Sequence, residues 1–170
     1  VEETGRILNE AMKTGLEGKR GAGASIERQI AESGYEHTDI SICAAGHRLG
    51  IDVTVHIAIG TDTIHVHPAA DGAVIGETSH IDFRKFTGHV ARLEGGVYIN
   101  LGSAVILPEV FLKALSAVRN IGHDVKSFTS VNMDMLQQYR PSENVLKRPS
   151  LSGATAINLN GHHEIMLPLL

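Results

Sequence analysis

Helical periodicity and glycine-rich breaks alternate along the first fifty residues. From Glu2 to Glu17, apolar residues recur every three or four positions with charged residues between them, which predicts an amphipathic helix. The glycine-rich stretch Gly18–Gly23 would end it. A second, short helix is expected over Ser25–Ser33, opened by a serine cap. A third is expected over Asp39–Leu49 and would end at Gly50.

The next segment has the pattern of a strand followed by a polar turn. Val53 to Ile59 is rich in β-branched residues and predicts a strand, which runs directly into Gly60-Thr61-Asp62. After Pro68, the pattern indicates a glycine-containing loop from Ala69 to Thr78. A helix would then open at Ser79 and run to about Leu93.

Short strands and helices alternate through the second half. The expected order is a strand at Val97–Leu101, a helix to about Ile121, a strand at Val125–Val131, a loop at Asp134–Ser152, a strand at Ala154–Leu159 and a last helix after Gly161. This alternation predicts an α/β fold: a doubly wound, mostly parallel, Rossmann-like sheet with helices on both faces. No repeat or linker divides the 170 residues, so a single domain is expected.

Composition narrows the class of protein. Apolar residues make up 42% and charged residues 20%, as in ordinary globular domains. The net charge of −4 and the lack of a long basic cluster argue against a nucleic-acid-binding protein. Cys43 is the only cysteine, which excludes an intrachain disulfide and a cysteine-based zinc site. No signal peptide or long apolar span is present, so a cytoplasmic protein without a membrane segment is expected. The chain runs from Val1 to an apolar end at Leu170, and we expect a fragment of a longer protein.

Two glycine turns are candidate binding sites. Ligands of open α/β proteins bind where parallel strands end, and Gly60-Thr61-Asp62 offers close backbone approach, a hydroxyl and a carboxylate there. At Gly102-Ser103 a strand meets a helix, whose free amide groups favour an anion such as a phosphate. The alternative is that a tight strand-to-helix turn simply needs small residues.

His65-Val66-His67 suggests a metal site. On an extended segment, residues two apart point the same way, so both imidazoles could bind one ion. With Asp62, His56 or the cluster His162-His163-Glu164, they would suit a metal-dependent hydrolase. The alternative is histidines that bond only to loops and water.

The late polar segment contains a candidate nucleophile. Lys147 would become one if partial burial lowered its pKa, and otherwise it is a solvated charge. Glu143 and Asp134 could bind an amine or be ordinary surface carboxylates. Glu109 suits the start of a helix, and Cys43 suits an apolar helix face.

The order of several motifs resembles the deoxyhypusine synthase family, and more closely a set of bacterial relatives of that enzyme. The resemblance covers about Ile51 to Leu170. It is carried by Gly60-Thr61-Asp62, Ile64–Pro68, Gly95–Ser103, Tyr139–Val145 and Gly161–Pro168.

This resemblance implies an NAD-binding homotetramer with active sites at subunit interfaces. The family oxidises spermidine with NAD and passes the aminobutyl group to an enzyme lysine and then to a protein lysine. By resemblance, Lys147 is the imine-forming lysine and Glu143 lines the polyamine pocket. Residues expected to border the cofactor are Gly60, Thr61, Asp62, Gly102, Ser103 and His162.

The chain departs from the family at one catalytic motif. Where the family has Lys-His-His, this sequence has Ile106-Leu107-Pro108-Glu109. We therefore keep three functions open: an NAD-dependent enzyme acting on an amine or polyamine, a metal-dependent hydrolase using His65, His67 and Asp62, and a non-catalytic ligand-binding relative.

Overall fold

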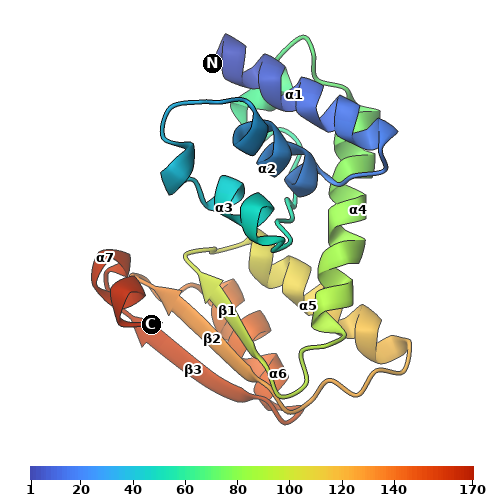
Figure 1. Ribbon diagram of the computed structural model, residues 1–170. Coiled ribbons are helices and arrows are strands. Elements are labelled where there is room, and N and C mark those ends of the chain that lie inside the picture. Colours follow the sequence, from blue (N-terminus) through green and yellow to red (C-terminus); the bar gives the residue numbers. More distant parts are fainter. The chain divides into compact units, whose positions relative to one another are not determined.

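The computed structural model describes all 170 residues, and they form two compact units (Figure 1). Unit 1 is Val1–Lys85 and unit 2 is Phe86–Leu170. The boundary lies inside helix α4 (Gly72–Val90). None of the helices combines the length and the hydrophobicity needed to cross a membrane.

Unit 1 is helical. Besides most of α4, it contains α1 (Glu2–Glu17), α2 (Ala22–Glu32), η1 (Thr38–Ile40), α3 (Ile42–Leu49) and η2 (Thr63–Val66). The predicted first helix is confirmed. The second begins earlier than predicted, because Gly21 and not Ser25 precedes its first turn; the Ser25 hydroxyl instead donates to the Gly21 carbonyl at 2.7 Å. The third ends at Gly50 with φ 66°, as predicted.

The strand predicted over Val53–Ile59 is wrong. The segment has no partner strand, and polar side chains of α4 take the place of a ladder. Asp82 Oδ2 accepts from the Val55 amide at 2.8 Å, and Ser79 Oγ accepts from the Ile57 amide at 3.0 Å. The apolar side chains of the segment pack on the core of unit 1, which explains their spacing.

The loop predicted over Ala69–Thr78 is also wrong. Helix α4 begins at Gly72, before the predicted start at Ser79, and ends at Val90. Asp71 caps it, because its Oδ1 accepts from the Ala73 amide at 2.8 Å. The two glycines of this segment thus lie in the first turns of a helix.

Unit 2 has an α/β architecture with a parallel sheet of three strands. Its elements are β1 (Val97–Leu101), α5 (Ile106–Asn120), β2 (Thr129–Asp134), η3 (Pro141–Lys147), α6 (Arg148–Ser150), β3 (Thr155–Asn160), α7 (His163–Met166) and η4 (Leu167–Leu169). The strand order is β1-β2-β3, and both pairs are parallel. The predicted strand Val97–Leu101 is confirmed, as are the α/β class and the parallel sheet.

Two predictions in unit 2 need correction. The middle strand starts at Thr129 and not at Val125, because the Val125 carbonyl accepts two bonds from the Arg119 guanidinium, at 2.9 and 2.7 Å. The segment Asp134–Ser152, predicted as a loop, is largely helical: the π-helix η3 runs directly into α6.

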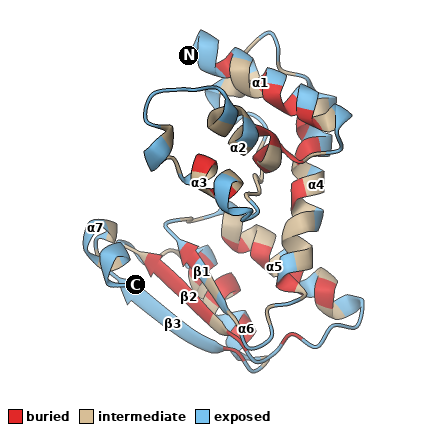
Figure 2. Ribbon diagram, viewed as in Figure 1, coloured by how far each residue is buried: buried red, intermediate tan, exposed pale blue.

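The helices of unit 2 lie against one face of its sheet. Tyr98 of β1 stacks on Phe111 of α5 with ring centroids 3.7 Å apart, and Figure 1 shows α5 and α6 behind the strands. Successive side chains of a strand point to opposite faces of the sheet. Tyr98 therefore shares this covered face with Asn100, Asn132 and Asn158. Figure 2 shows β2 buried along most of its length and β3 exposed throughout.

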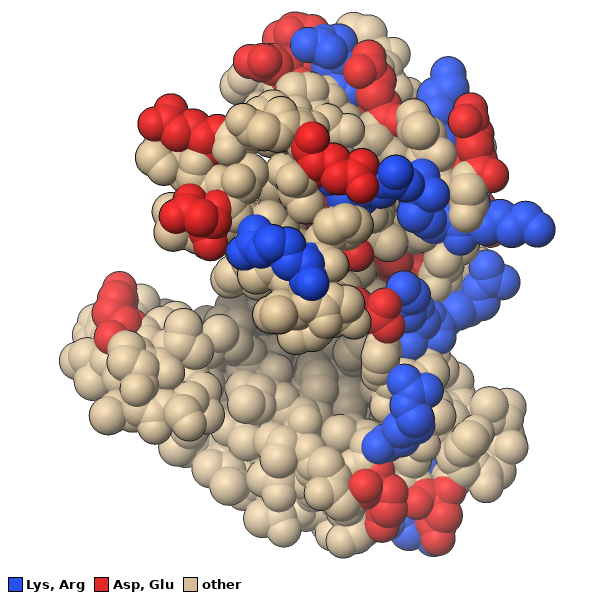
Figure 3. Space-filling view, in the orientation of Figure 1, with Lys and Arg blue, Asp and Glu red and all other residues tan.

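The opposite face of the sheet is apolar and is partly exposed along the two outer strands, whereas Val131 of β2 on the same face is 7% exposed. Its side chains at Val97, Ile99, Leu101, Ile157 and Leu159 are between 37% and 60% exposed. In the orientation of Figure 1, this is the face toward the viewer, and Figure 3 shows its centre free of charged side chains. We call these five residues the apolar sheet face.

Candidate functional site at the carboxyl edge of the sheet

Each strand of unit 2 carries an asparagine at the same register. Asn100, Asn132 and Asn158 are paired across the sheet. Asn100 Nδ2 donates to Asn132 Oδ1 at 2.9 Å, and Asn132 Nδ2 donates to Asn158 Oδ1 at 3.1 Å. We call this row the asparagine ladder. It lies next to the carboxyl ends of the strands, the edge at which α/β proteins bind ligands.

The ladder leaves one buried acceptor without a donor. Asn100 Nδ2 also donates to the Ser103 carbonyl at 2.9 Å, and because a carbonyl can only accept, the amide group of Asn100 must point there. Asn100 Oδ1 is therefore a buried oxygen with no hydrogen-bond partner. An unmatched buried acceptor costs about 1–3 kcal/mol, which a donor from a ligand would remove.

Gly102 and Ser103 connect β1 to α5 at this edge. Gly102 has φ +66°, a conformation that favours glycine, and its amide donates to the Met133 carbonyl at 3.0 Å. Ser103 Oγ accepts from the Leu107 amide at 3.1 Å and so fixes the start of α5. The predicted strand-to-helix junction is thus rigid, and it leads into the N-terminal amides of a 15-residue helix.

A histidine after β3 faces Gly102. A Cβ added at Gly102 would lie 3.3 Å from His163 Nε2, so glycine is what permits this approach. His163 Nδ1 is buried and has no hydrogen-bond partner. His162, the residue predicted from the sequence, precedes α7 and is exposed. The structure therefore brings His163, which the sequence suggested only as part of a metal-binding cluster, next to Gly102.

Glu143 and Lys147 lie one turn apart on η3. Lys147 Nζ is 3.0 Å from Glu143 Oε1, and the two side chains are 63% and 25% exposed. π-Helical segments are rare and are often found at functional sites. Asp134 ends β2, and its Oδ1 accepts from the Leu136 amide at 3.3 Å.

Glu109 joins η3 to α5. Its Oε1 accepts from Asn144 Nδ2 at 2.9 Å and lies 3.2 Å from Arg140 Nε. These contacts give Glu109 a structural role beyond the start of its helix. They also place Glu143 and Lys147 on a helix whose position on the sheet is fixed.

Gly60, Thr61 and Asp62 belong to unit 1, where they form a tight turn. His65 Nδ1 accepts from the amides of Gly60 and Asp62 at 3.1 and 3.3 Å. Asp62 in turn caps η2, accepting from the Ile64 amide at 3.3 Å. The polar groups of the turn thus bond chiefly to one another.

The metal site suggested by His65 and His67 is not formed. Residues 63–66 are a 3₁₀ helix and not an extended segment, so the premise that both rings point the same way is wrong. The Nδ1 atoms of both histidines accept from backbone amides, and His67 Nε2 is 3.6 Å from Glu2 Oε1. No group of three or more potential ligands in the chain is placed to hold a metal ion.

A second polar cluster lies inside unit 1 around Asp82. Its Oδ2 accepts from the amides of Gly23 and Val55 at 2.7 and 2.8 Å, while its Oδ1 is buried without a partner. Burial raises the pKa of this carboxyl, against the two amides and the charge of His56. Burial also lowers the pKa of His56, whose Nε2 lies 3.1 Å from Thr54 Oγ1. Because Asp82 joins α4 to the start of α2 and to the extended segment, we assign it a structural role.

The sequence contains a signal for the asparagine ladder that the motif analysis missed. Each strand has an asparagine between a β-branched residue and a leucine or methionine: Ile99-Asn100-Leu101, Val131-Asn132-Met133 and Ile157-Asn158-Leu159. An asparagine is unfavourable inside a strand, so three in the same context indicate a shared role.

The chain was compared with protein-family models, with curated proteins and with solved structures, and none of the three comparisons gave a match. The resemblance to the deoxyhypusine synthase family is therefore carried by the quoted motifs alone.

Proposed function

We propose that this chain is a deoxyhypusine-synthase-like enzyme that uses NAD to oxidise an amine or polyamine. One observation carries the proposal: Gly102, Ser103, the asparagine ladder and His163 lie together at the carboxyl edge of a parallel sheet. That edge is the ligand-binding position of doubly wound, Rossmann-like folds, and we propose this finer fold for unit 2.

The residues at this edge fit a dinucleotide. The N-terminal amides of α5 would hold the pyrophosphate, with Gly102 giving close backbone approach. Asn100 Oδ1 is an acceptor in need of a donor and His163 Nδ1 lacks a partner, which suits ribose hydroxyls because they both donate and accept. NAD, when bound, supplies a hydride acceptor to the substrate carbon beside the amine.

Glu143 and Lys147 supply the groups for the amine. A carboxylate attracts an ammonium group, as the ion pair of Glu143 with Lys147 shows. Glu143 would hold the substrate amine in the position that Lys147 Nζ occupies here. Lys147 must lose a proton before its nitrogen can attack, and it would lose that proton to water once the substrate amine has displaced Lys147 Nζ from Glu143. The neutral nitrogen would then add to the imine carbon. The bond from that carbon to the departing amine would break, the amine would leave with the proton given up by the attacking nitrogen, and Lys147 would keep the alkyl group as an imine.

One observation favours the non-catalytic alternative. Lys147 is 63% exposed and ion-paired, whereas lysine nucleophiles are normally activated by burial. The family's Lys-His-His motif is also replaced at Ile106–Glu109, and Glu109 is engaged by Asn144 and Arg140. A protein that binds the cofactor without turning over an amine would have these features.

Thermal denaturation with NAD, followed by turnover with spermidine, tests the proposal. Ligand at about 100 times its Kd stabilises the folded state by about 2.7 kcal/mol, or about 5–10 °C in Tm for a chain of this size. We expect this rise with NAD and its loss in Gly102→Ala, which adds strain and a contact with His163. We expect NADH to form with spermidine. We expect Lys147→Ala to lose the attachment of the alkyl group to the protein, because hydride transfer precedes the attack of Lys147.

Two matched variants serve as controls. Gly122→Ala changes another glycine of positive φ, at +98°, with open space around it. Lys126→Ala removes another lysine that is 63% exposed and ion-paired, here with Asp124. The absence of any Tm rise with NAD would refute the proposal. NAD binding without NADH formation would refute the enzymatic function and favour a non-catalytic ligand-binding protein.

We also propose that the protein is a homo-oligomer, as the resemblance to a tetrameric family implies. A Rossmann-like sheet is covered on both faces, and the apolar sheet face is exposed over five side chains. A second copy would cover it. We expect Ile157→Lys to lower the molar mass measured by light scattering, since it buries a charge in that interface. Ile121→Lys, at a residue 73% exposed outside the sheet, is the control. A monomeric wild-type protein would contradict this proposal.

A further inference from the structure

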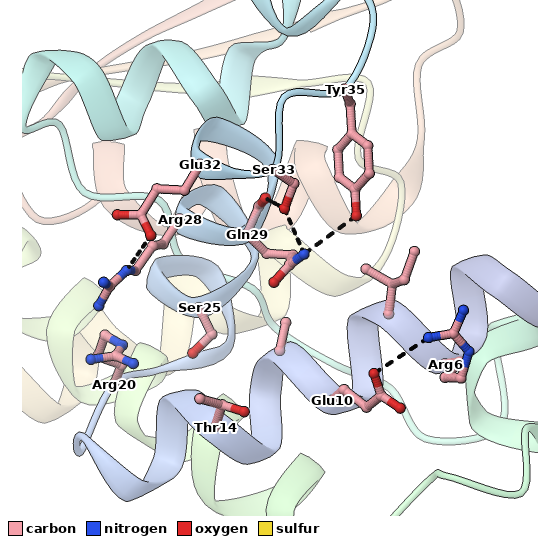
Figure 4. Close-up of a pocket in the computed structure, with 12 residues that line it drawn as sticks. Arg6, Glu10, Thr14, Arg20, Ser25, Arg28, Gln29, Glu32, Ser33 and Tyr35 are labelled. Carbon is pink, nitrogen blue, oxygen red and sulfur yellow. Dashed lines mark hydrogen bonds and ion pairs between the residues drawn. The ribbon is translucent and has the colours of Figure 1, made fainter.

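A groove between α1 and α2 in unit 1 is large enough for a small molecule. Its volume is about 740 Å³, within the usual 300–1,000 Å³ of ligand sites. Figure 4 shows side chains of both helices pointing into it, together with Arg20 from the connecting turn and Tyr35 from the loop after α2. None of the catalytic, cofactor-binding or metal-binding residues expected from the sequence lines this groove.

The positive charge of the groove is only partly neutralised. Three arginines and two glutamates line it. Arg6 lies 3.5 Å from Glu10, and Arg28 Nε lies 2.9 Å from Glu32 Oε2. Arg20 pairs with no carboxylate, and its Nε is buried without a hydrogen-bond partner. One guanidinium therefore remains unmatched inside the groove.

The unmatched guanidinium is held in place by the turn before α2. Lys19 has φ 55°, which redirects the chain between the two helices. Arg20 lies over Gly18, where a Cβ would meet its Nη1 at 2.5 Å. Figure 4 shows Arg20 and Arg28 at the same end of the groove, with Ser25 beside Arg20. Two neighbouring guanidinium groups with only one carboxylate partner favour an anion between them.

The other end of the groove has an aromatic ring and an amide. Figure 4 shows Tyr35 away from Arg20, and the Gln29 side-chain amide donates to the Tyr35 hydroxyl at 3.3 Å and to Ser33 Oγ at 2.7 Å. This leaves Gln29 Oε1 free to accept from a ligand. A tyrosine ring offers a flat apolar surface for a planar group.

We propose that this groove binds a phosphate-bearing small molecule of mononucleotide size. Its phosphate would lie on Arg20 and Arg28, since a guanidinium binds phosphate through two parallel hydrogen bonds. Its planar group would lie toward Tyr35 and Gln29. The site goes beyond the proposed enzymatic function, because all of its residues belong to unit 1, whereas the carboxyl edge of the sheet belongs to unit 2.

Calorimetric titration of the whole chain with AMP, inorganic phosphate and acetate tests the site. We expect AMP to bind more tightly than inorganic phosphate, and acetate to bind weakest. Arg20→Gln should weaken AMP binding about 10–100-fold, as expected for the loss of charged hydrogen bonds. Arg20→Lys should also weaken it, because lysine lacks the planar fork. Tyr35→Leu should weaken AMP but leave inorganic phosphate unchanged.

The control is Arg84→Gln, which removes an exposed arginine of unit 1 paired with Glu77 outside the groove. It should leave AMP affinity unchanged. No heat with any of the three ligands, or wild-type affinity for AMP in Arg20→Gln with an unchanged melting curve, would overturn the site. If acetate bound as tightly as inorganic phosphate, the proposal that the ligand bears a phosphate would be wrong.

The proposals for the groove and for the NAD site are tested by different variants. Gly102→Ala should keep AMP binding, and Arg20→Gln should keep the Tm rise with NAD. If Arg20→Gln abolished the effect of NAD while Gly102→Ala did not, the carboxyl-edge proposal would fail and the groove would stand. Loss of AMP binding in Gly102→Ala would overturn the groove as a separate site.

Discussion

Replacing Asp82 with alanine is expected to lower the free energy of unfolding by about 2–6 kcal/mol. The carboxylate accepts from the amides of Gly23 and Val55, and removing it leaves both donors without partners in or near the core. Each such donor costs about 1–3 kcal/mol. Urea denaturation followed by circular dichroism measures the change. A loss below about 1 kcal/mol would contradict the structural role of Asp82, because surface changes stay within that range.

Asp82→Asn is the matched variant, and it isolates the charge. The asparagine oxygen can still accept from both amides, so we expect a much smaller loss of stability than in Asp82→Ala. Burial raises the pKa of Asp82 above its ordinary value of 3.8. The folded state therefore binds the proton more tightly than the unfolded state, and wild-type stability falls as pH rises from 3.8 through the raised pKa. Asp82→Asn should lack this fall.

His56 acts in the opposite direction and does not obscure that test. Burial lowers its pKa below 6.5, so the unfolded state binds the proton more tightly. Its contribution to stability is lost as pH falls from 6.5 through the lowered pKa. The slope from His56 remains in Asp82→Asn, although removing the Asp82 charge lowers the His56 pKa further. A difference between the two proteins that grows as pH rises from 3.8 identifies the carboxyl.

The elements that could be predicted from the sequence are those with strong local signals. The helix Glu2–Glu17 has a continuous apolar stripe, and the strand Val97–Leu101 is a short, mostly apolar run between glycines. Gly50 ended its helix as predicted, because its positive φ is a local property of the residue. The alternation of such elements was enough to predict the α/β class.

The extended segment Val53–Ile59 could not be predicted, because its partners are distant in sequence. Its composition fits a strand, but Asp82 and Ser79 satisfy its amides from 22 to 27 residues away. Sequence pattern indicates that a backbone is extended and apolar; it does not indicate whether side chains or another strand supply the hydrogen bonds. The start of α4 was predictable in principle, since Asp71 is a standard N-terminal cap.

Prolines misled the prediction in unit 2. Pro141 and Pro149 suggested a loop, but Pro141 lies at the first position of η3, where proline is tolerated, and Pro149 lies in α6, which continues η3. The error matters for the candidate site, because a loop prediction does not place Glu143 and Lys147 on the same face of a helix. Their contact at 3.0 Å depends on helical spacing, which a loop prediction could not give.

The candidate site itself was predicted in part. Gly102 and Ser103 were identified from the strand-to-helix turn, and both lie at the carboxyl edge. The asparagine ladder was missed, because its hydrogen bonds depend on strand register, which no single strand reveals. His162 and not His163 was expected beside the cofactor, because only the packing of the segment after β3 decides which ring faces Gly102.

Phe111→Ala is expected to destabilise unit 2 by about 3–5 kcal/mol. Phe111 is fully buried, stacks on Tyr98 of β1 and meets the Phe128 ring edge-on at 6.1 Å, so it joins α5 to the sheet. Truncation removes a large apolar surface and both ring contacts, which are worth about 0.5–1.5 kcal/mol each beyond their burial. Urea denaturation measures the loss.

The same variant links the stability of unit 2 to its proposed site. Phe111 lies in α5, whose first turn follows Gly102 and Ser103, so a loosened helix would misplace the amides offered to a ligand. We therefore expect Phe111→Ala to weaken NAD binding, and Phe111→Leu, which keeps most of the volume, to weaken it less. Ile121→Ala, at an exposed position just after α5, should change neither property. Full stability in Phe111→Ala would mean that α5 is held to the sheet by other contacts, and the rigid junction inferred at Gly102 would lose its support.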